Sequence, residues 1–334
     1  MSLQQRATLD DVARLAGVSR KTVSRVYSEP EKVAGTTRDQ VLAAARRLRF
    51  RPNTLARTLR RGGTSSTVGL LIGDMSNPFY HSVAAGIERE LSSAGLTLVL
   101  GSSDDSEEGE ERVADALLSQ RVAALMMIPA AADQSYLDGE RQLGTPVIAV
   151  DRPAKNLLAD AVLLQNRSGA RQATEALLAQ GHRQIAYLAS PADIYTQRER
   201  LAGYRGAMTE AGLGRTGPLE HLSDDADEDA VARAALGSAE PPTAVLAGNN
   251  RMSVAVLRAA RELQVSPALI GFDDFDTADV LGISVISHDP LEMGRRAAAL
   301  AVERIARPAT VPEVVELPTR LVLRGSERPE GVSL

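Results

Sequence analysis

Cysteine and tryptophan are absent from this sequence of 334 residues, and aromatic residues make up only 3% of it. Without cysteine the chain can form no disulfide bond, no thiol nucleophile and no cysteine metal site. The four histidines, His81, His182, His221 and His288, are scattered without paired spacing, which argues against a histidine metal site. We therefore expect neither a metal ion nor another cofactor.

Long apolar runs are also missing. No stretch of about 18 apolar residues exists, so we expect no transmembrane helix and no membrane partner. The N-terminus lacks the continuous apolar segment of a signal peptide, so we expect a cytoplasmic protein. At about 100–200 residues per domain, the length predicts two or three domains.

Basic residues are concentrated at one end of the chain. Residues 1–61 hold 14 Lys and Arg against 5 Asp and Glu, whereas the remainder holds 24 basic and 38 acidic residues. The net charge of −5 averages over this division. A basic segment on an acidic body is typical of a local nucleic-acid-binding module. An acidic body repels phosphate and confines the contact to that segment.

Residues 8–27 have the pattern of two short helices joined by a tight turn. Thr8 can cap the first helix, and Gly17 is the residue type that ends a helix in a left-handed conformation. Ser19 can cap a second helix over residues 20–27. The outer face of that helix offers hydrogen-bond donors from Arg20, Lys21, Ser24 and Arg25. Such a helix fits the DNA major groove, although any surface helix has a polar face.

The following segment completes a small basic head. A third helix is predicted over residues 37–48, and three short helices can share one core. Residues 51–61 then contain a short helix that is too small to be stable alone in water. It is either part of a charged linker or a helix that folds only when paired with a second copy on DNA. In the second case Leu59 could wedge between base steps in the minor groove.

From Thr67 onward, apolar strand-like runs alternate with helical segments. The predicted strands are 68–72, 96–100, 123–128, 146–150, 184–189, 243–248 and 268–272. The predicted helices lie near 78–94, 107–119, 166–180, 200–211, 250–263 and 291–306. This alternation predicts parallel sheets covered by helices on both faces, arranged as two lobes. Ligands in such folds bind at the carboxyl ends of the strands, where polar residues follow several of these runs.

The sequence resembles the lactose/purine repressor (LacI) family of bacterial transcription factors nearly end to end. The motifs that carry the resemblance stand at residues 8–26, 49–60, 68–80, 145–153, 181–191, 198–208, 248–259, 269–280 and 317–326. It implies an α/β fold class: a three-helix helix-turn-helix head, a hinge helix, and a two-lobed parallel α/β sandwich core like a periplasmic binding protein. The head would span 1–50, the hinge and linker 51–66, the N-terminal lobe 67–163 with 289–319, and the C-terminal lobe 164–288 with 320–334.

The resemblance also implies a function. A homodimer would bind palindromic double-stranded operator DNA as a repressor, controlled by a small polar effector such as a sugar, a sugar derivative or a nucleoside/purine. The implied DNA-binding residues are Thr8, Ser19, Arg20, Lys21, Thr22, Ser24, Arg25, Asn53, Thr54, Ala56, Arg57 and Leu59. Because Arg and Lys bind guanine, we expect at least one G in each half-site. The chain ends without the heptad repeat that makes some relatives tetramers.

The same resemblance assigns effector-binding residues in the core. They are Phe79, Arg152, Thr196, Arg200, Asn249, Asp273 and His288. Carboxylate, guanidinium and amide groups suit vicinal hydroxyls or a polar ring, although Asp273 and Arg200 could instead form a structural ion pair.

Three departures from the family pattern concern the pocket. Gln165-Asn166 and Asn249-Asn250 each lack a usual carboxylate, and residues 223–226 lack an aromatic. We therefore expect a less acidic pocket, in which stacking comes from Phe79, Tyr195 or Phe275.

Two other functions fit parts of the sequence. A solute-binding protein would share the two-lobed core but not the basic head. An enzyme on a Rossmann-like core is opposed by the lack of GxGxxG, Walker and GxSxG motifs. The Asp273-Asp274 pair has no adjacent nucleophile or base, so we predict no catalytic residues and no enzymatic activity.

Overall fold

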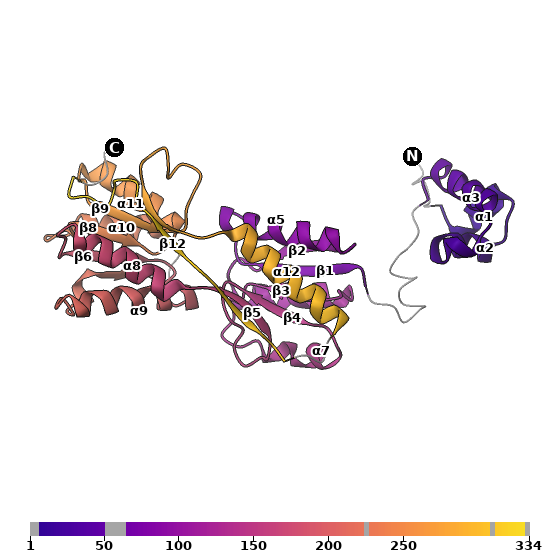
Figure 1. Cartoon of the computed structure of the whole chain (residues 1–334), viewed down its shortest axis with the longest axis horizontal. Coiled ribbons are helices and arrows are strands. Elements are labelled where there is room, and N and C mark those ends of the chain that lie inside the picture. The colour runs from indigo at the N-terminus through magenta and orange to yellow at the C-terminus, as the bar shows by residue number, and fades with distance from the viewer. Residues whose placement is uncertain (1–6, 51–64, 224–226, 308–310, 331–334) are drawn as a thin grey trace. The chain divides into compact units, whose positions relative to one another are not determined.

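The structure is a computed structural model that describes residues 7–50, 65–223, 227–307 and 311–330 (Figure 1). The chain forms two compact units, Met1–Ser65 and Ser66–Leu334. Within the described ranges, every helix is too short or too polar to span a membrane.

The first unit is a bundle of three helices, α1 (Leu9–Ala16), α2 (Arg20–Ser28) and α3 (Gly35–Arg47), with a 3₁₀ turn at Pro30–Lys32. Its small core consists of Val12, Ala13, Val23, Val26, Val41, Ala44 and Ala45. Gly17 has a φ of 68°, and this left-handed conformation reverses the chain between α1 and α2. The helix-turn-helix prediction is confirmed, and α3 begins at Gly35, slightly before the predicted start.

The second unit contains two six-stranded sheets, which define an N-lobe and a C-lobe. The N-lobe sheet has the order β11-β5-β4-β3-β1-β2 and is entirely parallel. Its strands are β1 (Thr67–Ile72), β2 (Thr97–Ser102), β3 (Leu125–Met127), β4 (Val147–Val150), β5 (Asp160–Leu164) and β11 (Val314–Leu317).

The C-lobe sheet has the order β12-β10-β9-β8-β6-β7, with one antiparallel pair, β10 and β12. Its strands are β6 (Ile185–Ala189), β7 (Glu220–Leu222), β8 (Ala244–Ala247), β9 (Ala268–Phe272), β10 (Ser284–Ser287) and β12 (Arg320–Val322). The two mainly parallel sheets confirm the predicted fold class.

Helices cover both sheets (Figure 1). The N-lobe helices are α5 (Pro78–Ser93), α6 (Glu107–Ser119), α7 (Asp138–Gln142) and α12 (Pro290–Ala306). The C-lobe helices are α8 (Asn166–Ala179), α9 (Tyr195–Glu210), α10 (Glu228–Leu236) and α11 (Asn250–Leu263). They pack in pairs: α5 contacts α12, α8 contacts α9, and α10 contacts α11.

The described chain passes between the lobes at three places. These are Gln165 between β5 and α8, residues 288–289 between β10 and α12, and residues 318–319 between β11 and β12. Each lobe is therefore built from segments that are distant in the sequence. Three short connections that run side by side between two lobes are the arrangement expected of a hinge, about which the lobes could rotate as rigid bodies.

A buried ion pair ties the returning chain to the N-lobe. Arg304 on α12 contacts both carboxylate oxygens of Asp160 on β5 at 2.7–3.2 Å, and both side chains are at most 7% exposed. Asp160 also accepts a hydrogen bond from the backbone N–H of Glu313 at 2.8 Å. One carboxylate thus fixes α12 and the chain that leads into β11.

Two glycines bring α5 and α12 into backbone contact. A Cβ atom on Gly86 would overlap the carbonyl oxygen of Leu291, and one on Gly294 would overlap the carbonyl oxygen of Val83. Both glycines are required by this close approach, since rigid backbone cannot move aside.

We predict that Gly86→Ala and Gly294→Ala each lower the stability of the core by about 1–3 kcal/mol, because the added methyl group forces the helices apart. Gly206→Ala on α9 is the matched control. Open space surrounds that position, and replacing a helical glycine there should stabilise by about 0.5–1 kcal/mol. Chemical denaturation measures all three. Unchanged stability in both contact variants contradicts the packing described.

Candidate functional site

Helix α2 presents a polar and basic face to solvent. Arg20, Lys21, Ser24 and Arg25 are exposed, whereas Val23 and Val26 are buried in the core of the head. Residues three and four apart share one face of a helix, so Lys21, Ser24 and Arg25 lie side by side. This face is a row of hydrogen-bond donors on an element that the DNA major groove can accept.

The other predicted DNA contacts in the head lie at helix ends. Thr8 accepts a hydrogen bond from the Asp11 N–H at 3.3 Å, and the Asp11 carboxylate accepts the Thr8 N–H in return. Ser19 Oγ accepts the Thr22 N–H at 3.1 Å, and the two hydroxyls lie 2.8 Å apart. These caps fix where α1 and α2 begin. The five hinge residues lie outside the described residues: Asn53, Thr54, Ala56, Arg57 and Leu59.

A cleft of about 560 Å³, counting its open mouth, lies between the N-lobe and the C-lobe. Its walls are loops and helix N-termini that follow the carboxyl ends of strands in both sheets. Six of the predicted effector residues line it: Phe79, Arg152, Thr196, Arg200, Asn249 and Asp273. The seventh, His288, is not part of the lining but contacts Asp273 from a crossing segment.

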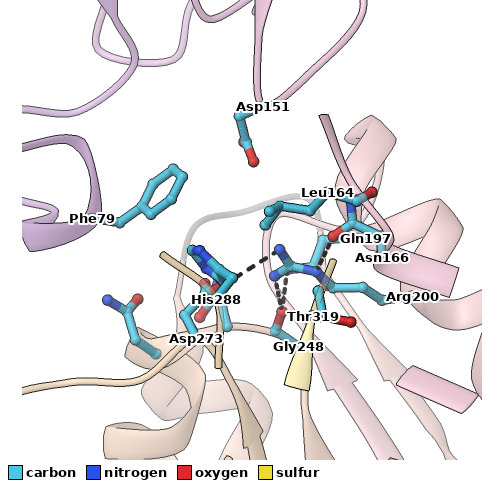
Figure 2. Close-up of polar contacts among 12 residues, drawn as sticks. Phe79, Asp151, Leu164, Asn166, Gln197, Arg200, Gly248, Asp273, His288 and Thr319 are labelled. Atoms are coloured by element: carbon cyan, nitrogen blue, oxygen red, sulfur yellow. Dashed lines mark hydrogen bonds and ion pairs between the residues drawn. The ribbon is translucent and has the colours of Figure 1, made fainter. Parts of the chain in front are cut away.

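On the C-lobe side, Arg200 is the centre of a buried polar network (Figure 2). Its Nε donates to Asn166 Oδ1 at 2.8 Å, and its Nη1 donates to the Gly248 carbonyl at 2.6 Å. Its Nη2 lies 3.6 Å from Asp273 Oδ1, and its Cζ lies 3.6 Å from the centre of the Phe272 ring. Arg200 therefore connects α9 with α8 and with the ends of β8 and β9.

Asp273 combines burial with ionic partners. It is 9% exposed, and His288 Nε2 donates to its Oδ1 at 3.0 Å. Burial alone would raise the pKa of Asp273, but Arg200 and His288, through their charges and hydrogen bonds, hold that pKa below its ordinary value. The carboxylate is therefore ionised at neutral pH and accepts hydrogen bonds. The His288 ring also packs edge-on against Phe79, with ring centres 5.4 Å apart.

On the N-lobe side, Arg152 is buried and paired in a similar way. Its Nη1 donates to Asp105 Oδ1 at 3.0 Å and to the Pro129 carbonyl at 3.2 Å. Its Nη2 donates to the Tyr80 hydroxyl at 3.1 Å, and Asp151 Oδ2 lies 3.8 Å from its Nε. Burial raises the pKa of Tyr80, so this hydroxyl stays protonated.

Side chains from both lobes meet at the cleft. Arg251, at the start of α11 in the C-lobe, donates from Nη1 to Asp74 in the N-lobe at 2.6 Å, and its Nε lies 3.3 Å from Glu228. Asn250 Nδ2 donates to Asn77 Oδ1 at 3.3 Å across the same gap. These contacts exist only at a lobe angle that brings the two sides together.

Two predicted effector residues stand at helix N-termini. Asn249 Oδ1 accepts the Met252 N–H at 2.7 Å and so caps α11, which leaves its amide nitrogen as a donor. Thr196 is 3% exposed and lies in the first turn of α9, which no side chain caps. Backbone N–H groups in a first helical turn are hydrogen-bond donors for a ligand.

The structure adds carboxylates that sequence reasoning did not select as effector contacts. Asp151, which follows β4, is 5% exposed and points into the cleft (Figure 2). Burial raises the pKa of Asp151, and Arg152 and Arg200 oppose this effect. Asp105 and Glu228 also line the cleft. Asp151 directly follows a predicted strand, so its position could have identified it as a cleft residue. No local sequence pattern identified Asp105 or Glu228.

The resemblance predicts a pocket less acidic than that of relatives, and the described lining holds five carboxylates and three guanidinium groups. Of the three candidate stacking residues, Phe79 lines the cleft. Tyr195 packs against a small N-lobe cluster, and Phe275 packs against the C-lobe core.

The two consecutive aspartates have separate partners. Asp274 pairs with Arg324 at 2.7 Å and 2.9 Å, while Asp273 faces Arg200 and His288. They do not act as one carboxylate dyad. Among the residues that the structure describes, no group of three or more His, Asp and Glu gathers closely enough to hold a metal ion.

Two sequence profiles match the chain. One described as "Bacterial regulatory proteins, lacI family" matches residues 8–53, and one described as "Periplasmic binding protein-like domain" matches residues 174–327. The ribose operon repressor of Escherichia coli K12 is 34% identical over 332 residues, covering 96% of this chain and 99% of the relative. The HTH-type transcriptional regulator CelR of Thermobifida fusca is 34% identical over 341 residues, covering 98% and 100%.

Solved structures agree with these relationships. The lac repressor dimer bound to operator and the anti-inducer ONPF has a TM-score of 0.83 and 26% identity, covering 97% of this chain and 100% of that one. The complex of the transcriptional regulator CelR with cellobiose has a TM-score of 0.70 and 31% identity, covering 96% and 100%. Head and core are thus matched together, and the chain belongs to the lacI family of bacterial regulatory proteins.

Proposed function

We propose that this protein is a transcriptional repressor that binds a palindromic operator as a homodimer and responds to a small polar metabolite in the interlobe cleft. The metabolite would be a sugar, a sugar derivative or a nucleoside/purine. The observation that carries the proposal is the presence in one chain of the basic α2 face and of a cleft lined by buried charge pairs. The operator-bound lac repressor dimer and the CelR–cellobiose complex support the two halves of the proposal.

In this proposal α2 enters the major groove, and Arg20, Lys21 and Arg25 contact base edges. Basic side chains bind guanine through its N7 and O6 acceptors, so each half-site contains at least one G. Arg20 lies 3.4 Å from Asp10, but both side chains are more than half exposed. Exposed pairs contribute little, so Arg20 can leave Asp10 for DNA at small cost. The other predicted DNA-binding residues of the head would then contact the phosphates: Thr8, Ser19, Thr22 and Ser24.

The hinge is proposed on the family relationship. Asn53, Thr54, Ala56 and Arg57 would lie near the minor-groove backbone, and Leu59 would wedge between base steps. An intercalated apolar side chain kinks DNA and increases the surface in contact with protein. Measuring the operator affinity of Leu59→Ala by fluorescence anisotropy tests this intercalation. An unchanged affinity contradicts the proposed role of Leu59.

In the cleft, Asp273 and Asp151 would accept hydrogen bonds from ligand hydroxyls. Arg200, Asn249 and the first turn of α9 would donate to ligand oxygens, and Phe79 would cover an apolar face. His288 would orient Asp273 from behind. Polar groups that converge on a largely buried cleft fix the orientation and identity of a ligand.

The lobe angle is the proposed link between effector and DNA. An effector that contacts both lobes favours one angle only to the extent of its differential affinity, typically about 1–3 kcal/mol. A change of angle alters the separation of the two hinges in a dimer. Unpaired hinge helices are too short to persist alone, so operator affinity falls when they separate.

Other functions receive less support. A solute-binding protein does not require the basic face of α2. A gel mobility-shift assay with DNA distinguishes a DNA-binding regulator from a solute-binding protein. We propose no enzymatic role, because the relatives with similar full-length chains are transcriptional regulators. Operator DNA lies in the bacterial cytoplasm, so we propose that the protein acts there.

We predict that Lys21→Ala weakens operator binding by about 1–3 kcal/mol and relaxes base preference at one position of each half-site, because a base-edge contact is lost. The operator is first selected from random-sequence DNA with the unaltered protein. Fluorescence anisotropy at a fixed salt concentration then gives the affinities. Arg47→Ala, an exposed residue in the last turn of α3, is the charge-matched control. Equal losses in both variants contradict base reading by Lys21.

We predict that Asp273→Asn abolishes the response to effector but leaves operator binding intact, because the carboxylate is replaced by a group of equal size that also tolerates the positive φ of 67°. A thermal-shift screen of sugars, sugar acids and nucleosides identifies the effector, and calorimetry measures its affinity. Asp274→Asn, the neighbouring carboxylate outside the cleft lining, is the control. If Asp273→Asn binds the same compound equally well, the assignment is wrong.

We predict that Arg251→Met widens the distribution of interlobe distances, because it removes the contact with Asp74. Both side chains are partly exposed, so the expected change is modest, on the order of 1 kcal/mol or less. The absence of cysteine allows spin labels at Leu143→Cys and Arg261→Cys, with labelled chains diluted in unlabelled protein. Arg258→Met is the control: Arg258 lies on α11 with Arg251, and the change removes an intralobe pair with Asp229 on α10. Identical distributions in all three proteins refute the bridge.

A further inference from the structure

The described residues that line the cleft include three guanidinium groups, from Arg152, Arg200 and Arg251. Guanidinium groups are the side chains best suited to bind phosphate or carboxylate, because their planar donors match two anionic oxygens at once. Whether the cleft accepts an anionic ligand therefore depends on whether these groups are free or already paired.

Each of the two buried guanidinium groups has a carboxylate within 3.6 Å, although the buried Nε of Arg152 has no hydrogen-bond partner among the described residues. Arg152 donates to Asp105, the Pro129 carbonyl and the Tyr80 hydroxyl, at 3.0–3.2 Å. Arg200 uses Nε and Nη1 in hydrogen bonds and has Asp273 at 3.6 Å from Nη2, as described above. An anionic ligand would have to displace a protein carboxylate from either group, and an uncompensated buried charge would remain.

The third guanidinium group has two carboxylate partners. Arg251 contacts Asp74 at 2.6 Å and Glu228 at 3.3 Å. Its side chain is 46% exposed, whereas those of Asp74 and Glu228 are 27% and 12% exposed. The local charge around Arg251 is therefore negative overall.

The charged side chains that line the cleft are mainly carboxylates. Asp151 is 5% exposed and points into the cleft, and its nearest cation is Arg152 at 3.8 Å, beyond hydrogen-bond distance. The carboxylates of the described lining exceed the guanidinium groups by two. Helix N-termini also face the cleft: that of α9 is uncapped and contributes about half a positive charge, whereas those of α5 and α11 are capped by Asn77 and Asn249.

We infer that the effector is an uncharged polyhydroxyl compound, and that phosphorylated or carboxylated forms of the same compound are rejected. This inference rests on the proposed function, since it specifies the ligand of the same cleft. Hydroxyl groups donate to Asp151 and Asp273, and their oxygens accept from the first turn of α9. An added phosphate places negative charge beside carboxylates that outnumber the guanidinium groups of the lining, and such like-charge contacts are strongly unfavourable.

The first experiment compares matched compounds on the full-length protein. D-ribose is tested against ribose 5-phosphate, and D-glucose against glucose 6-phosphate and gluconate, by thermal shift and then by calorimetry. We expect stabilisation only by uncharged members, with the charged partner at least about 100-fold weaker. A charged member that binds more tightly than its uncharged partner overturns the inference.

The second experiment needs no knowledge of the effector. It tests whether the cleft rejects anions even if none of these sugars binds. Inorganic phosphate is titrated into the unaltered protein and into Asp105→Asn, which removes the carboxylate partner of Arg152. We expect no saturable binding to the unaltered protein and millimolar binding to the variant. Asp138→Asn, which removes an exposed carboxylate from Arg141 on α7, is the control and should not bind phosphate. Far-UV circular dichroism and melting temperature verify folding.

Each result has a defined consequence. Saturable phosphate binding to the unaltered protein overturns the inference if Arg200→Met or Arg152→Met abolishes that binding. A folded Asp105→Asn variant that gains no phosphate affinity also overturns it, because charge pairing is then not the cause. Failure of the proposed function is distinct: it appears as absent operator binding, or as operator binding that no small molecule alters.

Discussion

The ion pair between Arg200 and Asp273 joins most of the segments that meet on the C-lobe side of the cleft. Through its other donors Arg200 also holds Asn166 at the start of α8 and the carbonyl of Gly248 after β8. Asp273 in turn holds His288 on a crossing segment. Breaking such a buried pair typically costs about 3–5 kcal/mol, since one charge is left without a partner. The requirement that every buried charge be compensated thus determines both the shape of this wall and the kind of ligand that it admits.

The same requirement operates in the N-lobe, where it produces rigidity. Arg304 and Asp160 fix α12 to β5, and Gly86 and Gly294 let α12 lie directly on α5. Deformation within a lobe would break these contacts, whereas rotation about the three short crossings would not. The proposed motion of the core is therefore a change of lobe angle. The bridge from Arg251 to Asp74 is sensitive to that angle and spans the site where the effector is proposed to bind.

The parts of the fold that could be predicted from sequence are those where burial produces a strong local pattern. Strands β1, β4, β6, β8 and β9 were predicted within a residue or two at each end, because both faces of a central parallel strand are covered and the sequence is continuously apolar. Five strands were not predicted: β5, β7, β10, β11 and β12. The edge strands β7, β11 and β12 are three or four residues long and only partly buried, so their stability comes from neighbours rather than from their own composition. Strands β5 and β10 are buried but only five and four residues long, and each includes a polar residue, so neither forms a long apolar run.

The same distinction applies to the site: some of its residues could be predicted from local sequence, and others are placed only by tertiary packing. Motif residues at strand ends, such as Arg152 and Asp273, were placed on the cleft by sequence position alone. Helix α9 begins at Tyr195, about a turn before its predicted start. The prediction missed the first turn because the segment ahead of residue 200 is polar and no side chain caps the helix. Asp105 and Glu228 reach the cleft through loops and helix starts whose direction depends on packing. The acidity of the cleft therefore could not be read from the two substituted carboxylate positions.

The division of charge between head and core has a physical consequence for regulation. Phosphate contacts contribute most of the affinity of any DNA-binding module, without regard to sequence. The head concentrates its positive charge on a small bundle whose core is mostly valine and alanine, so one copy offers little contact surface. The acidic core adds none of its own affinity for DNA and instead repels it. In the proposed mechanism, tight operator binding comes from holding two heads and two hinges together. That arrangement would depend on the core, so a modest effector-induced bias in the lobe angle would change occupancy of the operator.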